Sequence, residues 1–177
     1  MVEQVYNAFL SCDQKVTTDT RNIAKNDLFF ALKGPNFNGN KFAEKALELG
    51  AKYAVIDEKE YFIEGKTFLV ENVLETLQNL ARHHREKINI PVVAITGTNG
   101  KTTTKELLGA VLSSKYNILI TQGNLNNHIG VPLTILQLTK EHEIAVIEMG
   151  ASKIGDIKEL VEIALPNYGI ITNFGKA

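Results

Sequence analysis

Four short apolar segments after Pro91 alternate with amphipathic stretches, and this alternation restricts the fold more than any other feature. The apolar segments are VVAIT, NILIT, EIAVIEM and YGIIT, and the stretches between them include KELLGAVLSSKY and DIKELVEIAL. Such alternation is typical of parallel strands joined by right-handed crossovers, with helices covering the sheet. Residues 89–177 are therefore expected to form a mostly parallel α/β sheet flanked by helices.

The first 88 residues predict a separate, smaller domain of mixed α/β type. Apolar side chains recur at helical spacing in residues 2–11 and 42–47, while residues 27–34 read as a strand closed by a glycine turn. KYAVID and KTFLVEN are two further strand candidates. Residues 73–88 predict an amphipathic surface helix, on which His83 and His84 are expected to face solvent.

We place the domain boundary near residues 88–91. The last predicted strand ends at GKA with no closing helix, so the second domain is expected to be incomplete at its C-terminal end.

A glycine turn stands between the apolar strand ending at Ile95 and the helical pattern that begins with KTTTKELL. Glycines allow the backbone to wrap closely around phosphates, and the N–H groups at the start of a helix point toward the anion. Lys101 can reach the β- and γ-phosphates of a nucleoside triphosphate, and the Thr102 hydroxyl can complete a magnesium shell. The predicted nucleotide-binding residues are Gly97, Thr98, Asn99, Gly100, Lys101, Thr102 and Thr103.

This turn has the shorter spacing G-x-x-G-K-T, because Ile95 stands where the general phosphate-loop pattern has its first glycine. The alternative is a purely structural turn between strand and helix. The position between this strand and this helix favours the nucleotide.

Composition argues against several other classes of protein. The chain has 177 residues, of which 44% are hydrophobic, and its net charge is −1, so bulk electrostatics indicate neither nucleic-acid nor membrane binding. No apolar run approaches the ~18 residues that span a bilayer. A single cysteine, Cys12, is expected to be a free or partly buried thiol, and the N-terminus lacks the regions of a signal peptide. These features predict a cytoplasmic protein.

Other polar residues follow the predicted strands, at the edge where parallel sheets bind their ligands. Glu148 ends one strand and offers hard oxygen ligands that suit Mg²⁺, although a solvated acid would look the same. Asn126 and Asn127 precede a helix, where asparagine often serves only as a cap. Thr172 and Asn173 follow the last strand and are weaker candidates for contact with metal or phosphate.

Four segments together resemble the Mur ligase family. TGTNGKTT at 96–103 is similar to the ATP loop of these ligases and of the related folylpolyglutamate and cyanophycin synthetases. GNLNNHIGVPLTIL (123–136), VIEMGASKIGDI (146–157) and ITNFGKA (171–177) follow in the family's order and approximate spacing. Residues 17–57 also resemble the family's UDP-sugar-binding first domain.

The resemblance implies roles for individual residues. It makes Glu148 a metal ligand and places Asn126 and Asn127, with Lys101, in the catalytic cleft, whereas His128 is left as a candidate surface residue. In the first domain, the resemblance implies a site for the uridine or pyrophosphate of a precursor. The alternative is that the same residues form only a turn with a surface salt bridge. The residues of that site are Thr20, Arg21, Asn38, Gly39 and Asn40.

The EMGAS form at 148–152 resembles the branch of the family that adds D-alanyl-D-alanine to UDP-N-acetylmuramoyl-tripeptide in peptidoglycan synthesis. ATP and Mg²⁺ are the implied cofactors, an acyl phosphate is the implied intermediate, and a monomer is expected. One alternative is the neighbouring ligase, which adds the third residue of the peptide. Another is a non-catalytic module that binds ATP as a switch. In the family, the residues that hold adenine, a modified lysine and a third domain for the amino substrate would follow Ala177, so the resemblance also implies that this chain alone is inactive.

Overall fold

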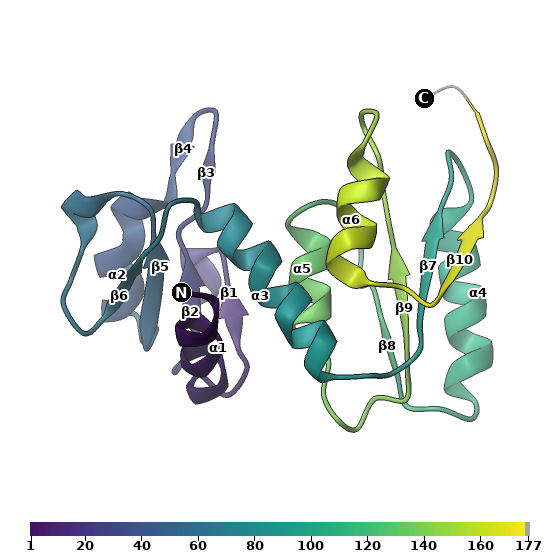
Figure 1. The fold of residues 1–177 in the computed structure, drawn as a ribbon, viewed down its shortest axis with the longest axis horizontal. Coiled ribbons are helices and arrows are strands. Elements are labelled where there is room, and N and C mark those ends of the chain that lie inside the picture. The colour runs from purple at the N-terminus through teal and green to yellow at the C-terminus, as the bar shows by residue number, and fades with distance from the viewer. Residues whose placement is uncertain (176–177) are drawn as a thin grey trace. The chain divides into compact units, whose positions relative to one another are not determined.

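The computed structural model describes residues 1–175, which form two compact units. The first unit comprises Met1–Leu80 and the second begins at Ala81, so the division falls within helix α3 (Val73–Lys87) (Figure 1). The last two residues of the ITNFGKA segment lie outside the described residues. Within the described part of the chain, every helix is too short or too polar to cross a bilayer.

The first unit is built on a four-stranded parallel sheet. Its strand order is β1-β2-β5-β6, and β3 and β4 form a separate antiparallel hairpin. The elements are α1 (Val2–Ser11), β1 (Val16–Thr17), β2 (Leu28–Phe30), β3 (Lys33–Gly34), β4 (Phe37–Asn38), α2 (Ala43–Glu48), β5 (Tyr53–Ile56) and β6 (Thr67–Leu69), with short 3₁₀ turns at Thr20–Asn22, Gly39–Phe42 and Lys59–Tyr61.

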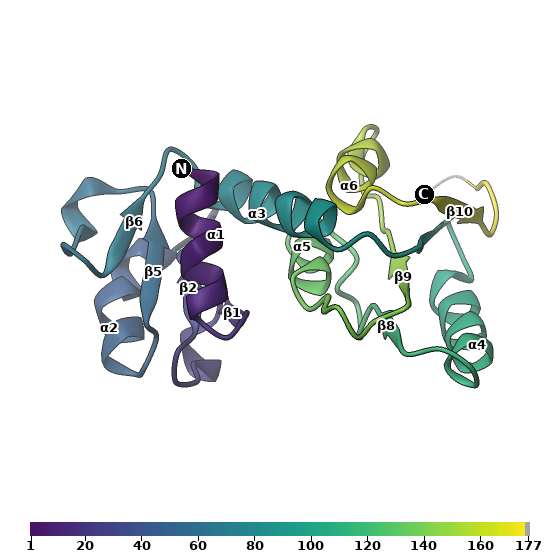
Figure 2. The ribbon, with the colours of Figure 1, turned by 60° about the horizontal axis from the view of Figure 1, so that its bottom comes forward.

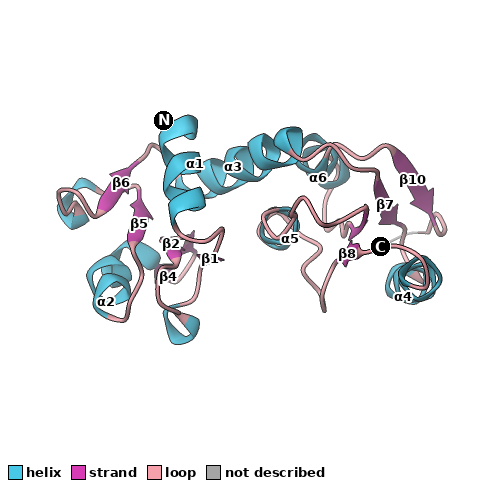
Figure 3. Cartoon of the chain, turned by 90° about the horizontal axis from the view of Figure 1, so that it is seen from below, coloured by secondary structure: helices cyan, strands magenta, loops and turns pink. Residues whose placement is uncertain are grey.

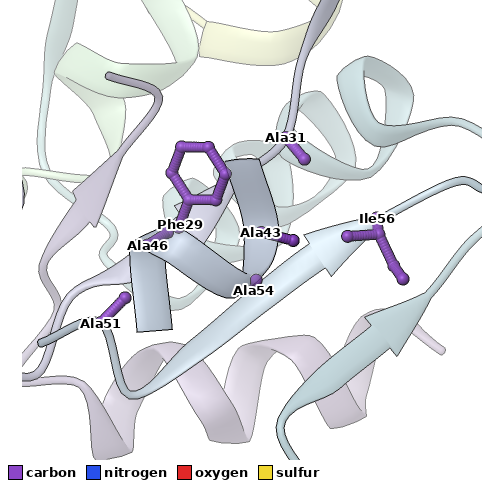
Figure 4. Packing of buried hydrophobic residues seen from close by; sticks show 7 residues of the cluster. All are labelled: Phe29, Ala31, Ala43, Ala46, Ala51, Ala54 and Ile56. Atoms are coloured by element: carbon purple, nitrogen blue, oxygen red, sulfur yellow. The ribbon is translucent and has the colours of Figure 1, made fainter. Parts of the chain in front are cut away.

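Helices cover both faces of this sheet, with α1 on one side and α2 on the other (Figures 2 and 3). On the α2 side, alanines of the helix meet Phe29 and Ile56 of the strands, and small side chains let the two layers approach closely (Figure 4). On the α1 side, Val5 and Phe9 are fully buried. Cys12 is a buried free thiol at the end of α1, as the sequence predicted.

The expected strand at 27–34 is shorter than predicted. It ends at Phe30, and a tight turn follows in which the Leu32 N–H donates to the Phe30 carbonyl at 2.9 Å. The remaining residues, Lys33 and Gly34, pair with β4 in the hairpin. The apolar pattern therefore did not reveal that the chain leaves the parallel sheet after Phe30 and pairs with β4 instead.

The second unit is also a parallel sheet, with strand order β10-β7-β9-β8. Helix α4 packs on one face, and α5 and α6 cover the other (Figure 3). This confirms the predicted α/β class. The elements are β7 (Val92–Thr96), α4 (Lys101–Ser113), β8 (Ile118–Ile120), α5 (Gly130–Ile135), β9 (Ile144–Glu148), α6 (Asp156–Ala164) and β10 (Tyr168–Ile171).

The prediction that His84 faces solvent is wrong. The residue is 1% exposed, and its Nε2 lies 2.8 Å from the Leu138 carbonyl oxygen. The neighbouring Arg85 is also buried, and its guanidinium donates to the carbonyls of Ala164 and Ile88 at 3.1 and 2.6 Å. The second half of α3 is therefore a core element of the second unit.

Burial of His84 makes the stability of the second unit dependent on pH. Desolvation lowers the imidazole pKa from 6.5, and the contact with Leu138 opposes this only in part. The unfolded state therefore takes up the proton at a higher pH than the folded state. The free energy of unfolding should fall as the pH drops below about 6.5, by at most ~1.4 kcal/mol per pH unit for this group.

Urea denaturation of the full-length protein between pH 5 and 8 measures this effect. His84→Gln keeps an N–H donor but does not titrate, so its unfolding midpoint should depend less steeply on pH. His142→Gln, at a half-buried histidine of the same unit, is the control. Equal slopes in wild type and His84→Gln would contradict the assignment.

Candidate functional site

The loop between β7 and α4 has the backbone of a phosphate-binding loop. Gly97 has a φ of 136° and Gly100 a φ of 80°, which are values that side-chain-bearing residues rarely adopt. A Cβ on Gly97 would also lie 2.1 Å from the Thr172 Oγ1. Helix α4 begins at Lys101, so the N–H groups of its first turn have no partner within the helix.

Lys101 folds back over this loop. Its Nζ donates to the Gly97 carbonyl at 2.6 Å and lies 3.4 Å from the Thr98 carbonyl oxygen. Thr102 and Thr103 follow in the first turn of α4, where both are exposed. A pocket of about 360 Å³ opens beside the loop and is lined by Thr96, Gly97, Thr98, Lys101, Ala151, Ile157, Ile171, Asn173 and Phe174.

The segment after β10 braces the loop from the neighbouring strand. The Thr172 hydroxyl lies 2.6 Å from the Asn99 carbonyl oxygen and 3.2 Å from that of Thr96. The Asn173 Oδ1 accepts a hydrogen bond from the Asn99 N–H at 3.0 Å. Sequence reasoning considered these two residues only as ligands of metal or phosphate and missed the bracing contacts.

Glu148 ends β9 at the same edge of the sheet. Parallel pairing places it opposite Ile95, the residue of β7 two positions before Gly97. Glu148 is 2% exposed, and its Oε1 accepts a hydrogen bond from the Asn126 Nδ2 at 2.8 Å. The backbone N–H of Glu148 donates to the Thr121 hydroxyl. Its Oε2 is buried without a hydrogen-bond partner among the described residues. Such an oxygen is a suitable ligand for a hard cation.

The two asparagines before α5 differ in their contacts. Asn126 holds Glu148, and its carbonyl oxygen accepts from the Gly150 N–H at 2.7 Å. The Asn127 Oδ1 accepts from the N–H groups of Ile129 and Gly130 and so caps α5. Asn126 therefore belongs to the carboxylate site, whereas the capping interpretation accounts for the contacts of Asn127.

His128 lies with Asp156 and Glu159, and one ligand atom from each residue falls within 4.8 Å of the others. Asp156 is buried and accepts hydrogen bonds through Oδ2 from the N–H groups of Ser152 and Lys153, at 2.8 and 3.0 Å. These bonds, the one from Ser152 foremost, lower the pKa of Asp156. The Lys153 Nζ also lies 3.9 Å from the Asp156 Oδ1, so protein groups surround this carboxylate.

The residues predicted to bind the precursor fall into two groups in the first unit. Thr20 and Arg21 line a pocket of about 590 Å³ together with Thr18, Asp19, Phe29, Phe37, Phe42 and Lys45. The exposed Arg21 side chain pairs with Asp19 at 2.6 Å and lowers the pKa of that carboxyl to about 2. Phe37 and Phe42 stack with their ring centroids 5.4 Å apart.

Asn38, Gly39 and Asn40 form the second group and have internal partners. The buried Asn40 amide donates to the Asp57 Oδ1 at 2.8 Å and accepts from the Asp57 N–H at 2.9 Å. The Asn38 Nδ2 donates to Glu58, and a Cβ on Gly39 would lie 2.4 Å from the Leu32 carbonyl oxygen. These contacts tie the turn before α2 to the end of β5.

The chain matches known proteins of one family along most of its length. The family described as "Mur ligase family, catalytic domain" matches residues 14–96, and the "Mur ligase middle domain" matches residues 95–177. A Synechocystis sp. protein named UDP-N-acetylmuramoyl-tripeptide--D-alanyl-D-alanine ligase is 44% identical over 92% of this chain and 36% of the relative. A Bacillus subtilis protein of the same name is 42% identical over the same shares.

Solved structures give the same result. The MurF ligase of Thermotoga maritima in complex with ADP matches with a TM-score of 0.84 and 38% identity, over 94% of this chain and 39% of that one. MurF from Acinetobacter baumannii matches with a TM-score of 0.85 and 38% identity, over 92% of this chain and 36% of that one. This chain spans little more than a third of the relatives' length. Because the two family matches together run from residue 14 to 177, the chain belongs to the Mur ligase family.

Proposed function

We propose that this chain is the precursor- and ATP-binding part of a ligase that adds D-alanyl-D-alanine to UDP-N-acetylmuramoyl-tripeptide in peptidoglycan synthesis. The observation that carries the proposal is the pairing of β7 with β9, which brings the Lys101 loop and the buried Glu148 carboxylate to one edge of the sheet. The names of the relatives, which match along nearly the whole chain, support this substrate over that of the third-residue-adding ligase.

On the ATP side, the loop and the start of α4 would bind the phosphates. The N–H groups of the first turn of α4 point toward the anion, and the Lys101 Nζ would exchange the Gly97 carbonyl for a phosphate oxygen. The Glu148 Oε2, which has no hydrogen-bond partner among the described residues, and the Thr102 hydroxyl are suitable ligands for Mg²⁺. When bound, Mg²⁺ would offset negative charge on the phosphates.

On the precursor side, the pocket of the first unit has the chemistry of a nucleoside diphosphate site. Arg21 and Lys45 supply two cations for a pyrophosphate, and the stacked pair of Phe37 and Phe42 offers an apolar surface to a base. Arg21 is exposed, so its exchange of Asp19 for a phosphate costs little. Thr20 adds a hydroxyl, whereas Asn38, Gly39 and Asn40 would set the shape of the neighbouring turn.

The proposed reaction is an acyl transfer driven by ATP. The terminal carboxylate of the precursor attacks the γ-phosphate and ADP leaves, which gives an acyl phosphate. The amine of D-alanyl-D-alanine then attacks the acyl carbon, and the amide forms as inorganic phosphate leaves and the amine loses a proton. Two anions must approach each other in the first step. The main contribution of this chain would therefore be to offset their negative charge with Lys101 and the oriented N–H groups. Asn126 would contribute by holding Glu148 at the edge of the cleft. We place the protein in the cytoplasm as a monomer.

Phosphate release by the full-length protein tests the proposal. Release should require ATP, Mg²⁺, UDP-N-acetylmuramoyl-tripeptide and D-alanyl-D-alanine together. Release with the dipeptide precursor and a diamino acid would instead identify the neighbouring ligase. Phosphate release from ATP that is independent of both substrates would identify a switch module.

Lys101→Ala should slow the reaction more than it weakens ATP binding. The backbone donors stay, but the cation that offsets the charge of the approaching anions is lost, at a cost of ~2 to 4 kcal/mol in the transition state. Steady-state kinetics and ADP calorimetry of the full-length protein separate the two effects. Lys115→Ala, at an exposed lysine just beyond α4, is the control. Unchanged turnover in Lys101→Ala would remove this residue from the site.

Thr172→Val should weaken ADP binding because it removes a contact that holds the phosphate-binding loop in place. Valine keeps the shape but loses the hydroxyl that holds the Asn99 carbonyl, so the loop loses a brace worth ~0.5 to 1.5 kcal/mol. This corresponds to roughly a 2- to 12-fold weaker affinity by calorimetry. Thr172→Ser restores the hydroxyl and should restore binding. Equal weakening in both variants would show that the hydroxyl is not the cause.

A further inference from the structure

A second lysine of α4, one turn beyond Lys101, is buried. Lys105 is 1% exposed, although lysine is almost never fully buried unless it is paired. Helical residues four positions apart share a face, and their side chains lean toward the start of the helix. Lys105 therefore reaches from α4 toward the end of β9.

The Lys105 ammonium group lies between two carboxylates that differ in exposure. Its Nζ is 3.1 Å from the Glu106 Oε1 and 3.7 Å from the Glu148 Oε2. The Glu106 side chain is 66% exposed and is stabilised by water, whereas the Glu148 side chain is 2% exposed. A buried carboxylate without a nearby cation is strongly disfavoured, so Glu148 depends on Lys105 far more than Glu106 does.

The distance between Lys105 and Glu148 matters for a metal ligand. At 3.7 Å the ammonium offsets the charge of the carboxylate but is beyond hydrogen-bond distance. Asn126 meanwhile holds the other oxygen, Oε1, at 2.8 Å. The buried Oε2 therefore has no hydrogen-bond donor among the described residues.

We propose that Lys105 is a positioning residue for the metal site. It holds the buried Glu148 carboxylate in place and stands in for a divalent cation until one binds beside Oε2. This inference rests on the proposed role of Glu148 as a metal ligand. A merely structural role, in which the stem of Lys105 packs or its head pairs with Glu106, predicts different results in the experiments below.

The first experiment is a double-mutant cycle on the full-length protein, followed by thermal unfolding in EDTA. Lys105→Met removes the charge at similar length, and Glu148→Gln removes its partner. Lys105→Met alone should lower the melting temperature by roughly 5 to 10 °C, because it leaves a carboxylate buried and unpaired. In the Glu148→Gln background the same change should lower it by less than half as much.

Glu106→Gln is the matched control for the exposed partner. Lys105→Met should lower the melting temperature by as much in the Glu106→Gln background as in wild type. Equal losses in the wild-type and Glu148→Gln backgrounds, or a loss that disappears only with Glu106→Gln, would overturn the proposal. If Lys105→Met alone fails to fold, a folded Lys105→Met/Glu148→Gln protein supports it. A double variant that also fails, while Glu148→Gln folds, contradicts it.

The second experiment adds ADP at saturation, with either Mg²⁺ or EDTA. A divalent cation should replace the missing charge, so Mg²⁺ with ADP should close more than half of the gap in melting temperature between Lys105→Met and wild type. An unchanged gap would contradict the stand-in role. If wild type shows no response to Mg²⁺ with ADP, the proposed nucleotide site fails, and the cycle in EDTA still decides whether Lys105 holds Glu148.

Discussion

The parallel pairing of β7 with β9 is the constraint on which the candidate site depends. Its register sets Ile95 opposite Glu148, so the loop that leaves β7 and the carboxylate that ends β9 meet at one edge. The pairing of β10 with β7 adds Thr172 and Asn173 to the same edge. A shift of one residue in either pairing would turn these side chains to the other face of the sheet.

Polar groups at this edge are held by the protein before any ligand arrives. Lys101 is held by loop carbonyls and Glu148 by Asn126, while the Asn99 backbone is fixed by the segment after β10. Groups that are already oriented need little rearrangement when charge moves in a reaction. The buried charge of Glu148 would destabilise the fold by itself, which is why its neighbours at Asn126 and Lys105 matter.

Sequence patterns predicted the α/β class, the strands of the second unit and the glycine loop, because these depend on periodicity and local backbone preference. They failed where a long-range contact decides the outcome. His84 and Arg85 look like the charged face of a surface helix, yet the second unit buries both. Lys105 was missed for the same reason, since only the β9 partner at Glu148 distinguishes it from other lysines of an amphipathic helix. Asn127 was ambiguous for a different reason: an asparagine before a helix can either cap the helix or bind a ligand, and the sequence pattern is the same in both cases.

The position of the metal relative to this edge tests the account most directly. A crystal structure of the full-length protein with ADP and Mn²⁺, with the metal located by its anomalous scattering, would show it. The account predicts one Mn²⁺ within about 2.0 to 2.3 Å of the Glu148 Oε2 and beside the phosphates on the 97–102 loop. A metal at His128, Asp156 and Glu159 instead, with Glu148 still facing only Asn126 and Lys105, would contradict it.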